Sequence, residues 1–390
     1  MDEMNKVKKK VNFEIFFGRI FIFLLSLFFI CFSVEFVSRK WFQKKITTFG
    51  GFDTDDKDHV AKPYAMSGAD PNKYMINKLG YYGPLPDEVK KEGEFRLFVL
   101  GGSTVYSGTR YGNEIGKPIT DLLTDVFHSK GHQNVKVFNF GNTGSITNQD
   151  LVKVLMDVAQ YQPDLIVFYG VGNDLTNFDG RPGYPQRFLL YENNPIWSKD
   201  LEDYKLLPLV LYGSAVLRRF FPSYFENAII DKNKMYAGVA SIHSDQWIDE
   251  TSQIYIQGIV KAHIISKAFG ANFIAIFQPL PGYKKNPSPG ELNSVGNAEI
   301  IKKARDNILR RVSQLNNYVN FYNLSDLFAD GNVQQFTDII HLTPTANLTA
   351  ANEIYNYIEK QYNGNFVPQS HPVKTLFEHK LNRSLASPPK

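Results

Sequence analysis

The chain has 390 residues, of which 43% are hydrophobic and 21% charged, so its composition is that of a globular protein and excludes collagen, a coiled coil and wholesale disorder. The formal net charge of +4 is mild and no basic stripe interleaved with aromatics occurs, which argues against nucleic acid as a partner. The single cysteine, Cys31, excludes an intrachain disulfide, a thiolate zinc site and an iron–sulfur cluster.

A hydrophobic segment near the N-terminus is the first feature in chain order. Residues 20–34 carry no charge, and the segment extends over about 16–37 if Arg19 and Glu35 reach toward the headgroups, which is long enough to cross a bilayer as a helix. No small-x-small cleavage site follows it, so we expect an uncleaved signal anchor. Basic residues on its two sides nearly balance. We expect the N-terminus inside, because the short tail is easily retained, and the large domain on the extracytoplasmic side.

The chain is expected to comprise four regions. These are a tail with the membrane anchor at 1–45, a linker or stalk at 46–92, an α/β domain at 93–365 and a polar tail at 366–390. Residues 46–92 lack sustained periodicity, which is typical of a loosely packed extension. Within the α/β domain, residues 178–250 do not follow the alternation of strands and helices, so we expect an insertion over the carboxyl edge of the sheet.

From residue 95 onward, short apolar runs alternate with segments of helical periodicity, a pattern typical of βα units and of a parallel sheet covered on both faces. The predicted strands are 96–100, 135–139, 165–169, 273–277 and 319–322. The predicted helices are 114–130, 148–160, 251–269 and one that begins at residue 344. The sequence therefore predicts a three-layer α/β/α sandwich around a five-stranded parallel sheet.

The last of these helices has a clear start. Thr343 is placed to cap it, and Pro344 suits its first position because proline has no N–H to leave unpaired there. The residues predicted to form its buried face are Leu348, Ala351, Tyr355 and Ile358.

Residues that directly follow the strands are expected to line a site, because ligands of open α/β sheets bind at the carboxyl ends of the strands. After the first strand, two glycines leave Ser103 exposed beside the start of a helix. The next two strands lead into loops that place the backbone amide of Gly144 and the side chain of Asn173 at the same edge. Such donors stabilise the oxyanion in acyl transfer. Each motif taken separately is equally explained by turn geometry.

A carboxylate and a histidine follow the last strand, in Asp338-Ile-Ile-His341. At this spacing the carboxylate accepts from Nδ1–H of the imidazole, so that Nε2 faces the serine as a general base. His341 by itself is also explained as an ordinary surface histidine. Its occurrence together with Ser103, Gly144 and Asn173, in strand order, favours a serine hydrolase.

These motifs resemble those of the SGNH branch of the GDSL hydrolases, over about residues 93–365. The resemblance implies a flavodoxin-like fold and a reaction without a cofactor. It assigns catalysis to Ser103, Asp338 and His341, and an oxyanion hole to Ser103, Gly144 and Asn173. Gly102 departs from the aspartate that usually precedes the serine, and Val171-Gly172 stands where Gly-x is usual.

The resemblance implies an esterase for small O-acyl groups, acetyl above all, on an envelope carbohydrate or a lipid-linked sugar, with lipid esters next. Residues 77–83 and the Glu35-x-x-x-Arg39 end of the anchor also resemble membrane-anchored bacterial members. Two alternatives stay open. One is an O-acetyltransferase of envelope polysaccharide that uses the same triad with a membrane acyl-donor partner, and the other is a non-catalytic scaffold.

Other chemistry finds little support in the sequence. There is no Walker motif, no Gly-x-Gly-x-x-Gly after a strand and no His-Glu-x-x-His. His128 and His132 are spaced to share a helical face, but Gly131 interrupts that helix end and no third metal ligand is apparent. We therefore expect no metal.

Overall fold

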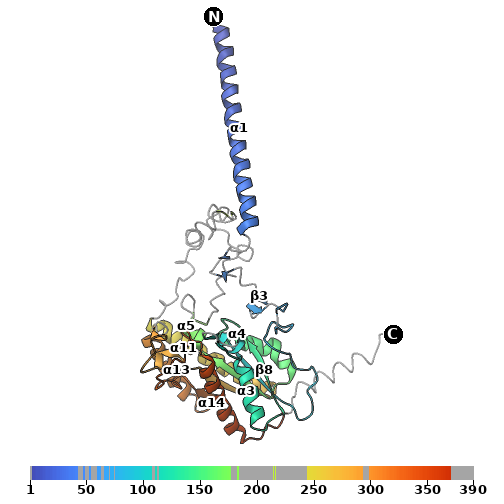
Figure 1. Ribbon diagram of the computed structural model, residues 1–390, viewed down its shortest axis with the longest axis vertical. Helices are drawn as coiled ribbons and strands as arrows, with labels where there is room; N and C mark the ends of the chain where they lie inside the picture. Colours follow the sequence, from blue (N-terminus) through green and yellow to red (C-terminus); the bar gives the residue numbers. More distant parts are fainter. Residues whose placement is uncertain are drawn as a thin grey trace, which may run out of the picture. The chain divides into compact units, whose positions relative to one another are not determined.

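A computed structural model describes residues 2–42, 71–73, 75–107, 114–176, 244–292 and 298–369, with the short pieces 47–48, 52–53, 59–62, 66–69, 110–111, 182–183, 214 and 216 (Figure 1). The chain divides into two compact units. One comprises Met1–Lys57 and Leu190–Ala237, and the other comprises Asp58–Leu189 and Gly238–Lys390.

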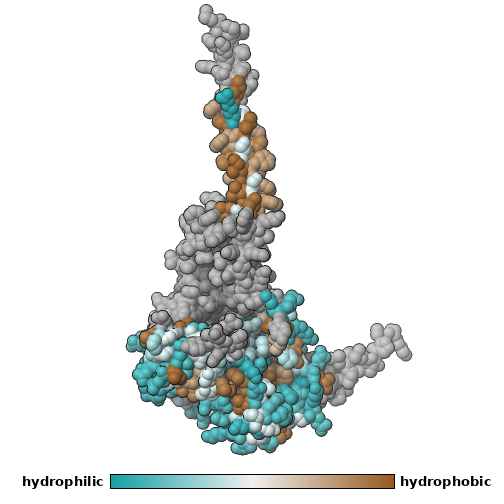
Figure 2. All heavy atoms as spheres, viewed as in Figure 1, coloured by the Kyte–Doolittle hydropathy of each residue, from teal (hydrophilic) through white to brown (hydrophobic). Residues whose placement is uncertain are grey.

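The first unit contains the long helix α1 (Asp2–Phe42). Within it, Ile15–Ser38 is long and apolar enough to cross a membrane, with 24 residues and a mean hydropathy of 2.6, and none of its most apolar stretch is buried. Figure 2 shows mostly hydrophobic side chains along this part of the helix, with a hydrophilic one among them. Near its end, Glu35 accepts a hydrogen bond of 2.7 Å from the Ser214 hydroxyl. The helix agrees with the span predicted at 16–37.

The second unit is built on a five-stranded parallel sheet with the order β8-β5-β9-β10-β11. Its strands are β5 (Phe95–Gly101), β8 (Val135–Gly141), β9 (Leu165–Gly170), β10 (Asn272–Phe277) and β11 (Asn320–Asn323). All were predicted to within two residues at either end. The first strand lies inside the sheet, and the chain adds β8 on one side before it returns to add β9 on the other. The strand order therefore reverses between β5 and β9, where ligands of such sheets bind.

Both faces of the sheet are buried. Along β5, Leu97 and Val99 face one core cluster while Phe98 and Leu100 face another. Because side chains alternate along a strand, a run of apolar residues supplies both clusters at once. This explains why the strands read as continuous apolar runs in the sequence.

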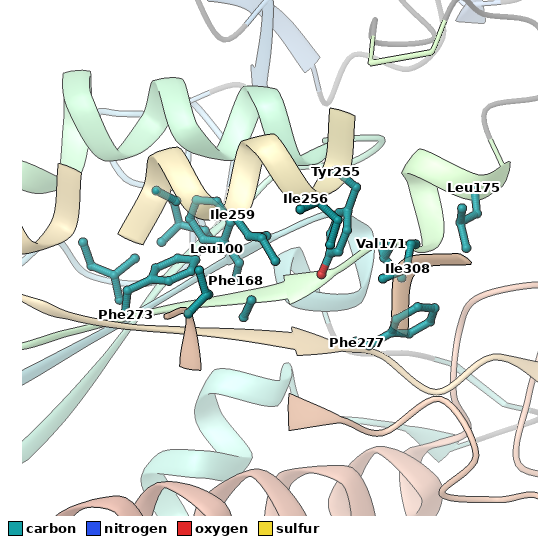
Figure 3. Packing of buried hydrophobic residues seen from close by; sticks show 14 of the residues in the cluster. Leu100, Phe168, Val171, Leu175, Tyr255, Ile256, Ile259, Phe273, Phe277 and Ile308 are labelled. Carbon is teal, nitrogen blue, oxygen red and sulfur yellow. The ribbon is translucent and has the colours of Figure 1, made fainter. Parts of the chain in front are cut away.

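Helices cover the two faces and complete the sandwich. One face carries α3 (Ile119–Ser129) and α14 (Pro344–Tyr362), which lie side by side in Figure 1. The other carries α4 (Thr147–Lys153), α11 (Asp245–Ala268) and α13 (Ala298–Ser313). Figure 3 shows side chains of α11 between that helix and the strands. The predicted three-layer α/β/α architecture is confirmed.

Three helix boundaries differ from the prediction. The helix predicted at 114–130 begins at Ile119, because Pro118 before it is extended, and Glu114–Ile115 instead pairs with Arg110–Tyr111 as a short hairpin. The helix predicted at 148–160 ends as α4 at Lys153 and continues as a π turn and a 3-10 turn.

The third difference concerns α11. It begins at Asp245, where the Ser244 hydroxyl caps it by accepting from the Trp247 N–H. The helix thus occupies the end of the insertion predicted at 178–250, most of which lies outside the described residues. Helix α13 was not predicted, since its sequence is rich in charged residues and only Ile301, Ala304 and Ile308 are buried.

The start of α14 is as predicted. The Thr343 hydroxyl accepts from the Ala346 N–H at 3.3 Å, and Pro344 takes the first helical position. Its buried face includes Ala351 and Ile358, but the prediction for Leu348 was wrong, since that side chain is 44% exposed. The buried residues form a stripe along the helix. Ala351 and Ile358 lie within this stripe, and Leu348 lies outside its edge.

The predicted linker and tail both contribute to the folded domain. Tyr81 is fully buried and its hydroxyl donates to Asp157, and Lys90 pairs with the buried Asp164. Residues 75–92 therefore pack on the domain that was predicted to begin at 93. At the other end Phe366 is buried, and the Gln369 N–H donates to Asp164 at 2.6 Å, whereas 370–390 lies outside the described residues.

Candidate active site

The carboxyl ends of four strands lie side by side. Gly101 of β5 is in register with Gly141 of β8 and Tyr169 of β9, and Phe277 of β10 is in register with Gly170. Residues that follow these strands therefore share one edge of the sheet. The candidate site lies at this edge.

Ser103 is half-buried and begins a single turn of helix, α2 (Ser103–Tyr106), directly after β5. The residue before it, Gly102, has extended backbone dihedral angles. A Cβ atom on Gly102 would lie only 2.2 Å from the Nδ2 atom of Asn173. Gly102 thus allows a close approach of the Asn173 amide, which a side chain here would prevent.

The structure brings Ser103, His341 and Asp338 into one hydrogen-bonded chain. His341 Nε2 lies 2.6 Å from Ser103 Oγ, and His341 Nδ1 lies 2.6 Å from Asp338 Oδ2. With the proton on Nδ1, the imidazole donates to Asp338 and accepts from the serine hydroxyl. Two residues that lie 238 positions apart in the sequence thus meet at the edge of the sheet.

Asp338 is held as an anion. Its Oδ1 atom accepts from the backbone N–H groups of Ile340 at 2.9 Å and His341 at 2.8 Å. Partial burial favours the neutral acid, but the hydrogen bond and charge of His341 and these two N–H donors outweigh it and lower the pKa of Asp338 to about 2. The carboxylate is therefore ionised at neutral pH and accepts the Nδ1–H of His341, which fixes the tautomer.

Gly144 and Asn173, two of the three predicted oxyanion donors, follow the strands β8 and β9. Gly144 has φ of +70°, a left-handed conformation that favours glycine, and a Cβ there would meet nothing within 4 Å. Asn173 lies in α5 (Gly172–Thr176), and its Nδ2 donates to the backbone oxygen of Ser145 at 2.8 Å. That bond uses one amide hydrogen and directs the other N–H away from Ser145.

Val171, which directly follows β9, has an unusual backbone conformation. Val171 has φ of +86°, a region that costs a β-branched residue about 1–3 kcal/mol. Its side chain is 2% exposed and belongs to the core cluster shown in Figure 3. Apolar burial of about this size offsets the strain.

Sequence reasoning missed a residue that bridges two sides of the site. Gln278 directly follows β10 and is buried. Its Oε1 accepts from the Gly172 N–H at 3.4 Å, and its Nε2 donates to the Ile340 oxygen at 3.3 Å. Gln278 therefore connects the loop before Asn173 to the loop that carries His341. The rule that strand-following residues line the site would have found it.

A buried ion pair supports the loop before Asp338. Glu291 bonds Lys284 Nζ at 2.7 Å and accepts from the backbone N–H groups of Gln335 at 2.7 Å and Phe336 at 3.0 Å. Burial raises the pKa of Glu291, but these donors outweigh it and bring it to about 2. Nothing in the sequence distinguished this pair from surface charges.

The part of the chain that the structure describes holds no group of three or more His, Cys, Asp or Glu residues suited to an ion. His128 Nε2 lies 3.3 Å from the Val135 oxygen, and the His132 ring packs edge-on against Phe366 at 4.7 Å. Both histidines thus have structural contacts.

Comparisons with known proteins give distant structural likeness. No family model and no curated protein sequence matches the chain. Among solved structures, a lipase/acylhydrolase from Enterococcus faecalis is 13% identical with a TM-score of 0.38, and the match covers 68% of this chain and 96% of that one. An acetylxylan esterase from Geobacillus stearothermophilus is 12% identical with a TM-score of 0.38, over 68% and 94% of the two chains.

A gut microbial diltiazem-metabolizing enzyme is 14% identical with a TM-score of 0.40, over 69% of this chain but only 48% of that one. At such scores and identities the likeness carries no functional argument.

Proposed function

We propose that this protein is a membrane-anchored serine hydrolase that acts on ester bonds. The observation that carries the proposal is the chain of contacts from Asp338 Oδ2 through His341 to Ser103 Oγ, with both distances at 2.6 Å. Such an arrangement activates a hydroxyl that is otherwise a weak nucleophile.

In the proposed reaction, Ser103 Oγ forms a bond to the ester carbonyl carbon while its proton moves to His341 Nε2. The tetrahedral intermediate collapses with cleavage of the bond to the alcohol oxygen, which takes the proton from His341. Water then attacks the acyl-enzyme, gives a proton to His341 and releases the carboxylic acid, and Ser103 regains its proton. Asp338 stays ionised throughout and stabilises the imidazolium.

The carbonyl oxygen becomes negatively charged in the tetrahedral intermediate. We assign its stabilisation to the backbone N–H groups of Ser103 and Gly144 and to the side-chain N–H of Asn173. Loss of one such donor costs about 3 kcal/mol in the transition state. No cofactor takes part in this sequence of steps.

The nucleophile is tested with the full chain in detergent. A fluorophosphonate probe is expected to label the wild-type protein and to spare Ser103→Ala, and hydrolysis of short p-nitrophenyl esters is expected to fall by about a thousandfold or more in the variant. Unchanged thermal unfolding shows that the variant is folded. Equal turnover by the two proteins, or folded wild type that the probe does not label, contradicts the proposal and favours a scaffold.

We propose small O-acyl esters, acetyl above all, on an envelope carbohydrate or lipid-linked sugar as the substrate class, on the basis of the family resemblance. The same acyl-enzyme supports an O-acetyltransferase if a sugar hydroxyl replaces water, with a membrane acyl-donor partner. Incubation with an acyl donor and excess glycan separates the two, because a hydrolase releases free acid and a transferase yields acylated glycan.

We propose further that α1 anchors the protein and that the catalytic domain lies on the extracytoplasmic side. The apolar stretch Ile15–Ser38 supports the anchor. Protease added outside intact spheroplasts is expected to digest the domain. Protection of the domain contradicts the orientation.

A further inference from the structure

A fully buried lysine contacts the ends of two strands that lead into the candidate site. Lys153 is the last residue of α4, and its side chain is 0% exposed. Its Nζ atom lies 2.6 Å from Asp150 Oδ1 and donates to the backbone oxygens of Phe140 at 2.9 Å and Gly101 at 3.3 Å. An ammonium group has three hydrogens, so all of them find acceptors here.

The acceptors belong to the segments that carry the candidate site. Gly101 ends β5 two residues before Ser103, and Phe140 lies near the end of β8, which leads to Gly144. Lys153 therefore joins the ends of two neighbouring strands from below. One cation thus contacts the ends of both strands that lead into the candidate site.

The carboxylate of the pair extends this link to the third loop. Asp150 Oδ1 also accepts from the Ser145 hydroxyl at 2.9 Å. The backbone oxygen of Ser145 in turn accepts from Asn173 Nδ2 at 2.8 Å. A continuous chain of bonds thus runs from Lys153 through Asp150 and Ser145 to the amide of Asn173.

A role in stability alone explains this pair poorly. Taking two charges out of water costs several kcal/mol per ion, and buried pairs are often replaced by apolar residues without loss of stability. Helix α4 packs on an apolar core where a leucine in place of the lysine would bury more apolar surface. An apolar residue at this position would lose the hydrogen bonds to these polar groups, all of which belong to the site.

We propose that Lys153 and Asp150 are positioning residues that hold the oxyanion hole of the proposed hydrolase in shape. Lys153 fixes the two strand ends, and Asp150 fixes Ser145 and through it the orientation of Asn173. This inference rests on the proposed function. Displacement of a donor by about 1 Å costs on the order of a hundredfold in rate, so the effect is expected in kcat more than in KM.

The structure offers a matched control at the opposite end of the sheet. Lys90 pairs with Asp164, and both side chains are nearly buried, at 8% and 0% exposed. Asp164 directly precedes β9 at its amino end and accepts from the Arg96 N–H. Removal of either lysine leaves a buried carboxylate without its cation, so both variants are expected to lose stability.

The test compares Lys153→Met with Lys90→Met in the full chain. Fluorophosphonate labelling rate and ester turnover are measured per folded molecule, below the unfolding temperature of each variant. Lys153→Met is expected to lower kcat and the labelling rate by about 10- to 100-fold with KM within about twofold, and Lys90→Met is expected to match the wild type. Equal rates for the two variants overturn the proposal.

Two further variants keep the test decisive if Lys153→Met folds poorly. Lys153→Met with Asp150→Asn removes both charges and retains an acceptor for Ser145, and it is expected to show the same loss of kcat. Ser145→Ala removes only the hydroxyl bond to Asp150 and keeps the backbone oxygen that accepts from Asn173. Its effect is expected to be smaller and not to add to that of Lys153→Met, since both act through one chain; full additivity contradicts that chain.

The outcomes also separate this inference from the function on which it rests. If wild-type protein is not labelled, or Ser103→Ala retains turnover, the proposed hydrolase itself is wrong. If Ser103 is required but Lys153→Met and its charge-free double variant work at wild-type rate, only the positioning role is wrong.

Discussion

The two ends of the central sheet are closed in different ways. At the amino end, Phe366 packs against Phe95 and Phe127, with ring centroids 5.4 and 5.2 Å apart. At the carboxyl end, the residues that follow the strands carry polar groups. These include the hydroxyl of Ser103, the imidazole of His341 and the amide of Asn173. Apolar contact seals one end, and hydrogen bonds organise the other.

Buried charge occurs at both ends, but its partners differ. At the amino end Asp164 binds Lys90 and the backbone N–H groups of Arg96 and Gln369, so it ties together segments that close the domain. At the carboxyl end Lys153 and Asp150 bind the loops of the candidate site. Comparable ion pairs therefore stabilise the fold at the amino end of the sheet. At the carboxyl end, in our proposal, they position the loops of the candidate site. Substitutions at each end test this division.

The largest effect is expected for Phe366→Ala at the amino end. Its ring is 5% exposed and lies among aromatic neighbours, so truncation leaves a cavity and costs about 3–5 kcal/mol of unfolding free energy. Because the ring is remote from Ser103, turnover per folded molecule is expected to stay unchanged. Denaturant unfolding and ester hydrolysis measure the two quantities. A fall in kcat without a fall in stability would break the comparison.

An intermediate effect is expected for Gly102→Ala at the carboxyl end. Its methyl group would lie 2.2 Å from Asn173 Nδ2 and displace that amide, which is expected to lower kcat by about 10- to 100-fold. Gly170→Ala is the matched control, since a Cβ at this strand end meets nothing within 4 Å. Steady-state kinetics measure both variants. Equal activity of the two would show that the position of Asn173 does not matter for catalysis.

The effect of Asp174→Asn is the smallest at each step of its measurement, which is the change of stability per pH unit. Asp174 accepts from the Thr147 N–H and hydroxyl at 3.3 and 3.1 Å. Burial, with a contribution from the charge of Asp150, raises the pKa of Asp174 to about 7 despite these bonds. Between about pH 4 and 7 the folded protein therefore holds a proton that the unfolded chain has released, so stability falls as pH rises, by at most about 1.4 kcal/mol per pH unit.

Asparagine at position 174 does not titrate, so this part of the slope is expected to vanish in the variant. Urea unfolding of both proteins at pH 5, 6 and 7 measures the difference. Parallel stability curves for wild type and Asp174→Asn would show that the carboxyl is ionised, or solvated, in the folded protein.

The positions of the strands and of the last helix could be predicted because their signals are local. A buried parallel strand requires a short apolar run, and a helix start requires a cap such as Thr343. The site motifs were found for the same reason, since each lies directly after a strand. Gln278 obeys the same rule and was overlooked.

Other features carried no local signal. Asp150 and Lys153 are three residues apart on α4, a spacing as typical of an exposed ion pair as of a buried one. Tyr81 lies in a stretch without periodicity, yet its side chain is fully buried. Which side of a helix faces the sheet, as for Leu348, depends on neighbours far away in the chain.

By itself, the amino-acid sequence determined the apolar helix at the N-terminus, the five strands and their order along the chain, and the residues that follow each strand. Only the tertiary structure decided that Ser103, His341 and Asp338 touch, and that Lys153 lies buried against the ends of β5 and β8. The physical reason is that secondary structure depends on residues nearby in the sequence. The burial of a charge, and contacts between side chains that are distant in the sequence, depend on how the strands are arranged in the sheet.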